Sequence, residues 1–75
     1  MPRLPNLSGK KLMQILLSAG FVLKRKSSSH FIVEHSDGRV TTIPIHSNKD
    51  LPKGTLGGIL RDIAITGDNL RDLMR

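Results

Sequence analysis

The chain lacks cysteine altogether, although it has 75 residues. This absence excludes a disulfide framework, a metal site built from cysteines and a cysteine nucleophile. It is also typical of a protein that works in a reducing cytoplasm. Phe21 and Phe31 are the sole aromatic residues. The core must therefore be built mainly from leucine, isoleucine and valine.

Long hydrophobic runs are missing as well. No stretch approaches the roughly 20 apolar residues that a membrane-spanning helix needs. Residues 1–5 hold two prolines and an arginine in place of an apolar run, which argues against a secretory signal. We therefore expect a cytoplasmic protein with no membrane partner. The length predicts a single domain, residues 1–75, with a small core and marginal stability.

Acidic residues are scarce. Six Asp and Glu face twelve Lys and Arg, for a net charge of +6. A field of this sign favours a polyanionic partner such as a nucleic acid. The six acids show no pattern of a two-metal site, and no glycine-rich loop has the spacing of a phosphate cradle. The histidines, at positions 30, 35 and 46, lack the spacing of zinc ligands. We therefore expect neither a metal nor a cofactor.

Apolar periodicity predicts two amphipathic helices. The first should run from about Gly9 to Ala19, with Ser8 as its N-cap and Gly20 as a left-handed C-cap. The second should begin with Thr55 as its N-cap. The apolar stripes are Leu12, Ile15, Leu16 and Ala19 in the first helix, and Leu56, Ile59, Leu60 and Ile63 in the second.

Two glycines weaken the second predicted helix. Gly57 and Gly58 each cost about 1 kcal/mol relative to alanine. Either a close approach of another backbone or simple tolerance explains them. Beyond this helix, Thr66 is predicted to cap a last short helix that contains Leu70 and Leu73.

Three strands are predicted between the long helices. The first begins at Phe21 and ends in a basic run, the second covers residues 30–35 and the third covers residues 40–45. Pro44 should lie at a strand end or on an edge, because proline cannot donate to a sheet ladder.

The connections between these elements are short. A turn of serines, residues 27–29, joins the first two strands, and Asp37-Gly38 predicts a type I′ hairpin turn between the second and third. Residues 1–6 should form an extended lead-in and residues 46–54 a polar loop.

The order of helix, three strands and helix predicts an α+β fold. Consecutive strands with short turns pair as an antiparallel three-stranded sheet. The two apolar helix stripes should cover one face of that sheet, which gives a two-layer sandwich. Double-stranded-RNA-binding domains share this α-β-β-β-α order and recognise RNA mainly by shape and backbone contacts.

Histidine and cations are the groups left for chemistry. RNA carries its own nucleophile, the 2′-hydroxyl, so a ribonuclease needs a group that moves protons and cations that stabilise the phosphate. His30 is the best candidate because it follows the serine turn, beside the basic strand end. His35 borders the hairpin and should be structural, whereas His46 either joins the site or only caps it. The cations expected to bind phosphate are Lys24, Arg25 and Lys26, with Arg39 a weaker candidate.

Short motifs recur in a defined order along the chain. They are Ser8-Gly9-Lys10, Ala19-Gly20-Phe21, Ser29-His30, Asp37-Gly38-Arg39, Ile43-Pro44 with His46, Leu51-Pro52-Lys53-Gly54-Thr55, and Ile59-Leu60 with Ile63. Each motif is weak alone, but their order and spacing together are specific. In this respect the chain resembles the HicA family of toxin ribonucleases over nearly its whole length.

The resemblance implies a double-stranded-RNA-binding-like fold and cleavage of messenger RNA that arrests translation. It also implies neutralisation by a HicB-type antitoxin, which we expect to cover His30. The catalytic histidine of the family follows Gly-Ser and corresponds to His30; here Ser28 replaces the glycine. Ser29 and His46 also correspond to family positions, and we include both among the expected RNA contacts.

Three hypotheses follow for the function. The first is a metal-independent endoribonuclease with His30 as general acid or base. The second is a non-catalytic double-stranded-RNA-binding module, which needs the same fold and charge but no histidine. The third is a protein whose basic face docks an acidic partner and never meets RNA. Cleavage products distinguish the first hypothesis from the other two.

Overall fold

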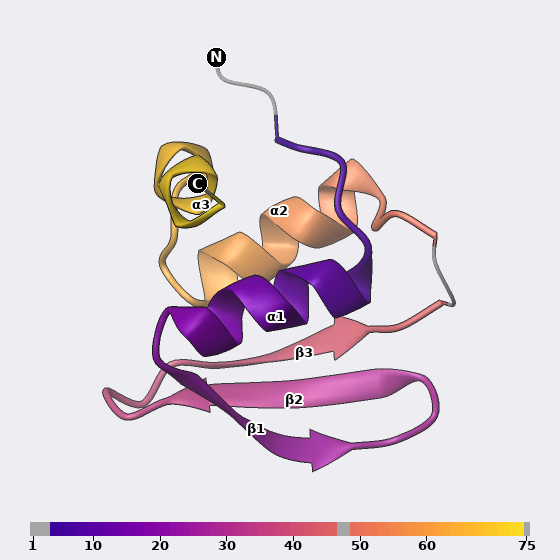
Figure 1. Ribbon diagram of the computed structural model, residues 1–75, viewed down its shortest axis with the longest axis vertical. Helices are drawn as coiled ribbons and strands as arrows, with labels where there is room; N and C mark the ends of the chain where they lie inside the picture. Colours follow the sequence, from indigo (N-terminus) through magenta and orange to yellow (C-terminus); the bar gives the residue numbers. More distant parts are fainter. Residues whose placement is uncertain (1–3, 47–48, 75) are drawn as a thin grey trace.

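Three antiparallel strands form a sheet with helices on one of its sides (Figure 1). The computed structural model describes residues 4–46 and 49–74; the remaining parts of the predicted lead-in and loop lie outside these ranges. The elements are α1 (Gly9–Ser18), β1 (Phe21–Lys26), β2 (His30–His35), β3 (Val40–Pro44), α2 (Lys53–Asp62) and α3 (Gly67–Leu73). The predicted two-layer α+β sandwich with a double-stranded-RNA-binding-like order is confirmed. Among the described helices, none is long and apolar enough to cross a bilayer.

The core lies between the sheet and the helices and is built from aliphatic residues. Both phenylalanines join it. The predicted helix stripes are buried, apart from a half-buried Ala19. The largest completely buried side chains are Leu12, Leu16, Val33, Ile43, Leu56, Ile63 and Leu70.

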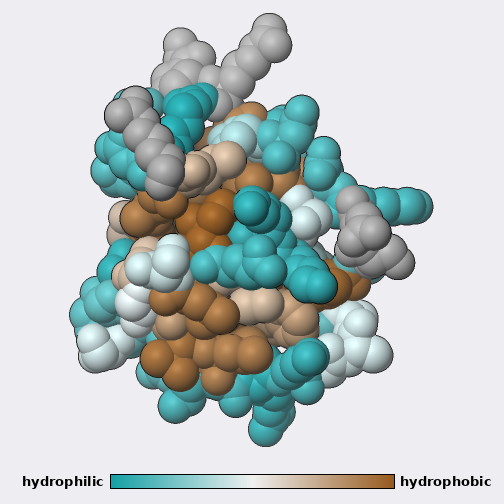
Figure 2. Space-filling model, in the orientation of Figure 1, coloured by the Kyte–Doolittle hydropathy of each residue, from teal (hydrophilic) through white to brown (hydrophobic). Residues whose placement is uncertain are grey.

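Some apolar surface stays exposed. Figure 2 shows apolar residues in the middle and lower part of one face, with hydrophilic residues around them. The large apolar side chains that remain exposed are Leu17, Val22, Val40, Leu73 and Met74.

The caps of α1 follow the sequence prediction. The Ser8 hydroxyl accepts a hydrogen bond from the backbone N–H of Lys11 at 3.1 Å. Ala19 is the C-cap, and Gly20 follows with a φ of 99°. Gly20 therefore has the left-handed conformation that glycine adopts without a steric penalty. Thr66 likewise caps α3, where it forms a capping box with Asn69.

The predicted N-cap of the second helix is wrong. α2 begins at Lys53, and Pro52 occupies the N-cap position without a side-chain hydrogen bond. The N–H of Leu51 donates to the carbonyl of Leu7 at 2.6 Å, and the N–H of Leu56 closes the first turn onto the carbonyl of Pro52. Because these hydrogen bonds hold the backbone before the helix, α2 begins two residues before Thr55. The capping preference of threonine, about 1 kcal/mol, does not decide where the helix begins.

The predicted type I′ hairpin turn is also wrong. Gly38 has a φ of 100°, but Asp37 is not among the described residues with positive φ, as a type I′ turn requires. The N–H of Gly38 donates to the carbonyl of His35, and the N–H of His35 donates to the carbonyl of Arg39. This pattern is a three-residue hairpin with glycine at its left-handed position. The Asp37 carboxylate accepts the Arg39 N–H at 3.1 Å and so stabilises this turn.

Close backbone approach occurs at Gly9 and not at Gly57 or Gly58 of α2. A Cβ atom on the buried Gly9 would collide with the carbonyl oxygen of Pro44 and would lie 2.9 Å from Ile45 Cδ1. At Gly57 and Gly58 the nearest atoms would be 3.7 and 3.8 Å away, which is ordinary van der Waals contact. Simple tolerance therefore accounts for the glycines of α2. Because Gly9 has no side chain, the start of α1 packs directly against the end of β3.

Substituting alanine at these two kinds of glycine should change stability in opposite directions. Gly9→Ala should destabilise the fold by roughly 2 kcal/mol, because α1 must move off β3 to make room. Gly58→Ala should stabilise it by about 1 kcal/mol, because the helix gains propensity and the Cβ has space. Urea unfolding followed by circular dichroism measures both changes. A Gly9→Ala protein as stable as the wild type would contradict the packing described here.

Acid should weaken the β2–β3 hairpin. Hydrogen bonds from Arg39 to the Asp37 carboxylate lower the pKa of Asp37 below its ordinary value of 3.8. A carboxyl whose pKa is depressed in the folded state contributes stability above its unfolded pKa and loses it as pH falls through the folded pKa. Asp37→Asn should therefore be less stable than the wild type at pH 7, and the difference should shrink below about pH 3. Urea midpoints at both pH values test this, with Asp72→Asn as the control. A difference that is the same at both pH values would refute it.

Candidate functional site

His30 lies at the first residue of β2, on the side of the sheet that the helices leave open. Along β2, Phe31 and Val33 are buried, whereas His30 is exposed. Since side chains alternate between the two faces of a strand, His30 lies on the face opposite the helices. Its partner across the ladder is Pro44 of β3.

The serine turn closes directly on His30. The Ser27 hydroxyl oxygen accepts the backbone N–H of His30 at 3.0 Å and that of Ser29 at 3.4 Å. The N–H of Ser27 in turn donates to the carbonyl of His30 at 2.9 Å. The Ser29 hydroxyl lies 2.9 Å from Nδ1 of the imidazole. Both the backbone and the ring of His30 are therefore held by serines of the turn.

The basic run does not act as one patch, because the strand register and a bulge divide it. Arg25 pairs with Ile32, two residues along β2 from His30, and so shares the open face with it. Lys26 pairs with the buried Phe31, and its ammonium lies 5.9 Å from that ring. Arg25 is therefore the cation of the run that lies diagonally across the open face from the imidazole.

Lys24 points away from this histidine. It falls in the bulge between Leu23 and Arg25, and its ammonium lies 3.8 Å from the carboxylate of Glu34. Glu34 is near the other end of β2. An exposed pair at this distance contributes little to stability, so Lys24 remains available to a stronger anion.

The structure does not bring Arg39 together with His30. Its guanidinium contacts the Asp37 carboxylate at 2.9 Å, donates to the carbonyl of Ile63 at 2.7 Å and lies 5.2 Å from the ring of Phe21. These contacts tie the β2–β3 hairpin to the end of α2. The two ends of β2 are five residue steps apart, or about 16 Å.

His35 has the structural role that the sequence predicted. Its ring packs edge-on against Phe21 with 5.1 Å between ring centroids. Its Nδ1 lies 3.3 Å from the backbone N of Asp37, within the hairpin turn. The ring therefore supports the turn from the helix side of the sheet.

His46 lies at the same end of the sheet as His30. The N–H of Ile45 donates to the carbonyl of Ser29 at 2.7 Å, so the pairing between the segments continues past Pro44. The exposed His46 follows immediately. The serine turn, the end of β3 and the start of α1 all lie together on the right of Figure 1, and the hairpin lies on the left.

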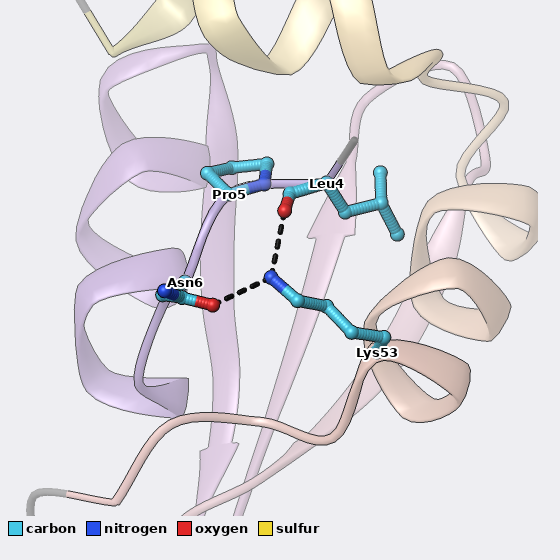
Figure 3. A pocket seen from close by; sticks show the side chains of 4 residues that line it. All are labelled: Leu4, Pro5, Asn6 and Lys53. Carbon is cyan, nitrogen blue, oxygen red and sulfur yellow. Dashed lines mark hydrogen bonds between the residues drawn. The ribbon is translucent and has the colours of Figure 1, made fainter. Parts of the chain in front are cut away.

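Lys53 has a role that the sequence did not reveal. Its ammonium donates to the carbonyl of Leu4 at 2.6 Å and to the side-chain oxygen of Asn6 at 2.7 Å (Figure 3). With Pro5, these residues line an open pocket at the start of α2. The contacts fasten the lead-in to the helix. The signal in the sequence was the Leu51–Thr55 motif, but nothing in its composition indicates a partner almost fifty residues away.

No three potential metal ligands cluster within residues 4–46 and 49–74. The two ring nitrogens of His30 differ in their surroundings. Within the described residues, Nδ1 is engaged by a hydroxyl, whereas Nε2 has no hydrogen-bond partner. Arg25 lies on the same face and can balance the charge of a phosphate.

Comparison with known proteins places this geometry in a family. A model of the HicA toxins of bacterial toxin–antitoxin systems matches residues 9–65. The matched region contains the whole sheet, α1 and α2, and with them the serine turn and His30. A search of curated proteins gives no match. The chain therefore belongs to the HicA toxin family, whose place in toxin–antitoxin pairs implies an antitoxin as its partner.

Proposed function

We propose that this protein is the ribonuclease of its toxin–antitoxin pair, cleaving messenger RNA without a metal and arresting translation. His30 is the proton-transfer residue. The observation that carries the proposal is the exposed imidazole on the uncovered sheet face: its Nε2 has no hydrogen-bond partner among the described residues, and Arg25 lies diagonally from it on the same face. Family membership supports the toxin role.

The reaction needs little from the protein because RNA supplies the nucleophile. The 2′-hydroxyl oxygen attacks the adjacent phosphorus, the bond from phosphorus to the 5′-oxygen breaks, and a 2′,3′-cyclic phosphate forms. One proton leaves the 2′-oxygen and one is added to the departing 5′-oxygen. His30 serves one or both of these transfers, since the ordinary pKa of histidine lies near working pH.

The cations and polar groups near His30 bind the RNA backbone. Arg25 is placed to stabilise the charge that develops on the phosphoryl oxygens. Lys24, toward Glu34, and Lys26, beside Phe31, lie away from this centre and would bind phosphates farther along the RNA. Ser29 and His46 would contact the RNA at the same end of the sheet as His30. Arg39 is engaged by the hairpin, and we assign it a structural role.

A HicB-type antitoxin would inhibit this site most simply by covering His30. β1 carries three consecutive cations, of which Arg25 shares the open face with His30, and this positive strand suits an acidic surface on the partner. A complex that leaves His30 open to solvent would contradict this mode of inhibition.

A non-catalytic double-stranded-RNA-binding module is the second candidate, because the fold and the charge serve it equally well. It would bind RNA tightly, with strong salt dependence, and leave no new ends. Cleavage on a defined RNA separates the two.

The purified protein should cut RNA in the presence of excess chelator and leave 2′,3′-cyclic phosphate ends. Chelator should have no effect, because the RNA supplies the nucleophile and the imidazole of His30 transfers the protons, so the proposed reaction uses no metal ion. Mapping of the cleavage sites and of the end chemistry on a defined RNA is the measurement. Intact RNA under chelator, with cutting restored by a divalent metal, would overturn the metal-free mechanism.

Replacing His30 by alanine should lower the cleavage rate by at least about a hundredfold and abolish growth arrest, because proton transfer typically contributes that much. Arg25→Ala should lower the rate by roughly tenfold through lost phosphate stabilisation. Lys11→Ala is the matched control: it also removes one positive charge, but Lys11 lies beside Leu73 and Met74 in the groove between α1 and α3. Circular dichroism verifies the fold. A His30→Ala protein that stays fully toxic would remove His30 from the mechanism.

A further inference from the structure

We propose that Ser29 is a positioning residue for His30: its hydroxyl accepts a hydrogen bond from Nδ1–H and thereby makes Nε2 the nitrogen that exchanges protons with RNA. This inference rests on the proposed role of His30. It goes further by assigning a function to each ring nitrogen, and it gives Ser29 a role inside the protein in addition to its proposed RNA contact, since a hydroxyl that accepts from Nδ1–H can still donate its own hydrogen to a phosphate.

The contact between these neighbouring side chains depends on the bend that precedes β2. Consecutive residues of a strand point to opposite faces, so a strand residue does not reach the side chain of the next one. Ser29 precedes β2 and still belongs to the turn. For this reason its hydroxyl can lie 2.9 Å from Nδ1 of His30.

The Ser29 peptide is held on both sides, which keeps the hydroxyl in place. Its N–H donates to the Ser27 hydroxyl at 3.4 Å, and its carbonyl accepts the N–H of Ile45 at 2.7 Å. Ser27 also accepts the N–H of His30 at 3.0 Å. Ser27 therefore holds the backbone of both Ser29 and His30, and Ile45, at the end of β3, also holds that of Ser29. Positioning by prearranged groups costs no reorganisation during the reaction.

The acceptor role of the hydroxyl suits both forms of a proton-transfer histidine. In the imidazolium form both ring nitrogens are donors, so the hydroxyl must accept. In the neutral form that acts as a base, Nε2 is bare and Nδ1 keeps its hydrogen. The same hydrogen bond therefore persists while the proton leaves and returns at Nε2 alone.

A hydroxyl also avoids the electrostatic cost of a carboxylate. An aspartate at this position would orient the ring equally well, but it would place a negative charge next to the RNA phosphate. It would also raise the pKa of the imidazole by favouring the charged form. Serine orients the ring without repelling the substrate.

The decisive measurement is the tautomer of His30, which does not depend on RNA cleavage. The full chain, labelled with ¹⁵N-histidine, is examined by NMR at a pH where the ring is neutral, and His30→Ala identifies the signals of His30. The wild type should carry its hydrogen mainly on Nδ1. Ser29→Ala should shift the hydrogen to Nε2, and Ser29→Thr, which keeps the hydroxyl, should restore the wild-type tautomer.

Cleavage of a defined RNA by the same variants gives the second readout. Ser29→Ala should be slower by roughly tenfold, as expected for one lost hydrogen bond, and Ser29→Thr should recover most of the rate. Ser28→Ala is the matched control, because the Ser28 side chain makes no hydrogen bond within the part of the chain that the structure describes.

The outcomes separate this inference from the proposed function. A wild-type tautomer with hydrogen on Nε2, a tautomer unchanged in Ser29→Ala, or no recovery in Ser29→Thr would overturn the role of Ser29 even if the wild type cleaves RNA. A tautomer that responds as expected in a protein that cleaves no RNA would support the role of Ser29 and refute the ribonuclease.

Discussion

Burial of Phe31 and Val33 beneath the helices holds β2 in one orientation, and the position of His30 depends on it. Because side chains alternate along a strand, a slip of one residue would turn His30 inward and expose the apolar pair. The penalty of exposing both core residues therefore also protects the site. β2 is the central strand of the sheet, so its register is specified by ladders on both sides.

One histidine lies at each end of β2, and the surroundings of the two side chains differ. At the hairpin end, His35 packs on Phe21 beside a turn closed by Asp37 and Arg39. These contacts use the polar groups for structure. At the serine end, His30 has one ring nitrogen engaged and the other open. The serine end is therefore the end of β2 at which a histidine nitrogen remains without a partner among the described residues, and the proposed chemistry is assigned to it for this reason.

The uncovered face of the sheet links the fold to its partners. Helices cover one side only, which leaves Arg25 and His30 on the other side. The exposed Val22 and Val40 lie on that same face near the hairpin end, where both pair with Glu34. A surface with both cations and apolar side chains suits a nucleic-acid backbone and also a protein that competes for it. Family membership as a toxin makes such competition the expected mode of control.

His30 was singled out as a candidate by the serine turn and the basic run together with the family resemblance. Local residue patterns alone determined the order of the elements, the caps at Ser8, Gly20 and Thr66, and the aliphatic core. These features depend on side-chain period and on hydrogen bonds within a few residues, which a linear pattern contains. The start of α2, the conformation of the hairpin and the close approach at Gly9 were decided by the tertiary structure. So were the division of the basic run, the engagement of Arg39 and the position of the Ser29 hydroxyl. Each of these depends on strand register or on contacts between distant segments, such as Ile45 with Ser29, Arg39 with Ile63 and Lys53 with Leu4. Such contacts exist only once the chain has packed, because local propensities of about 1 kcal/mol yield to them.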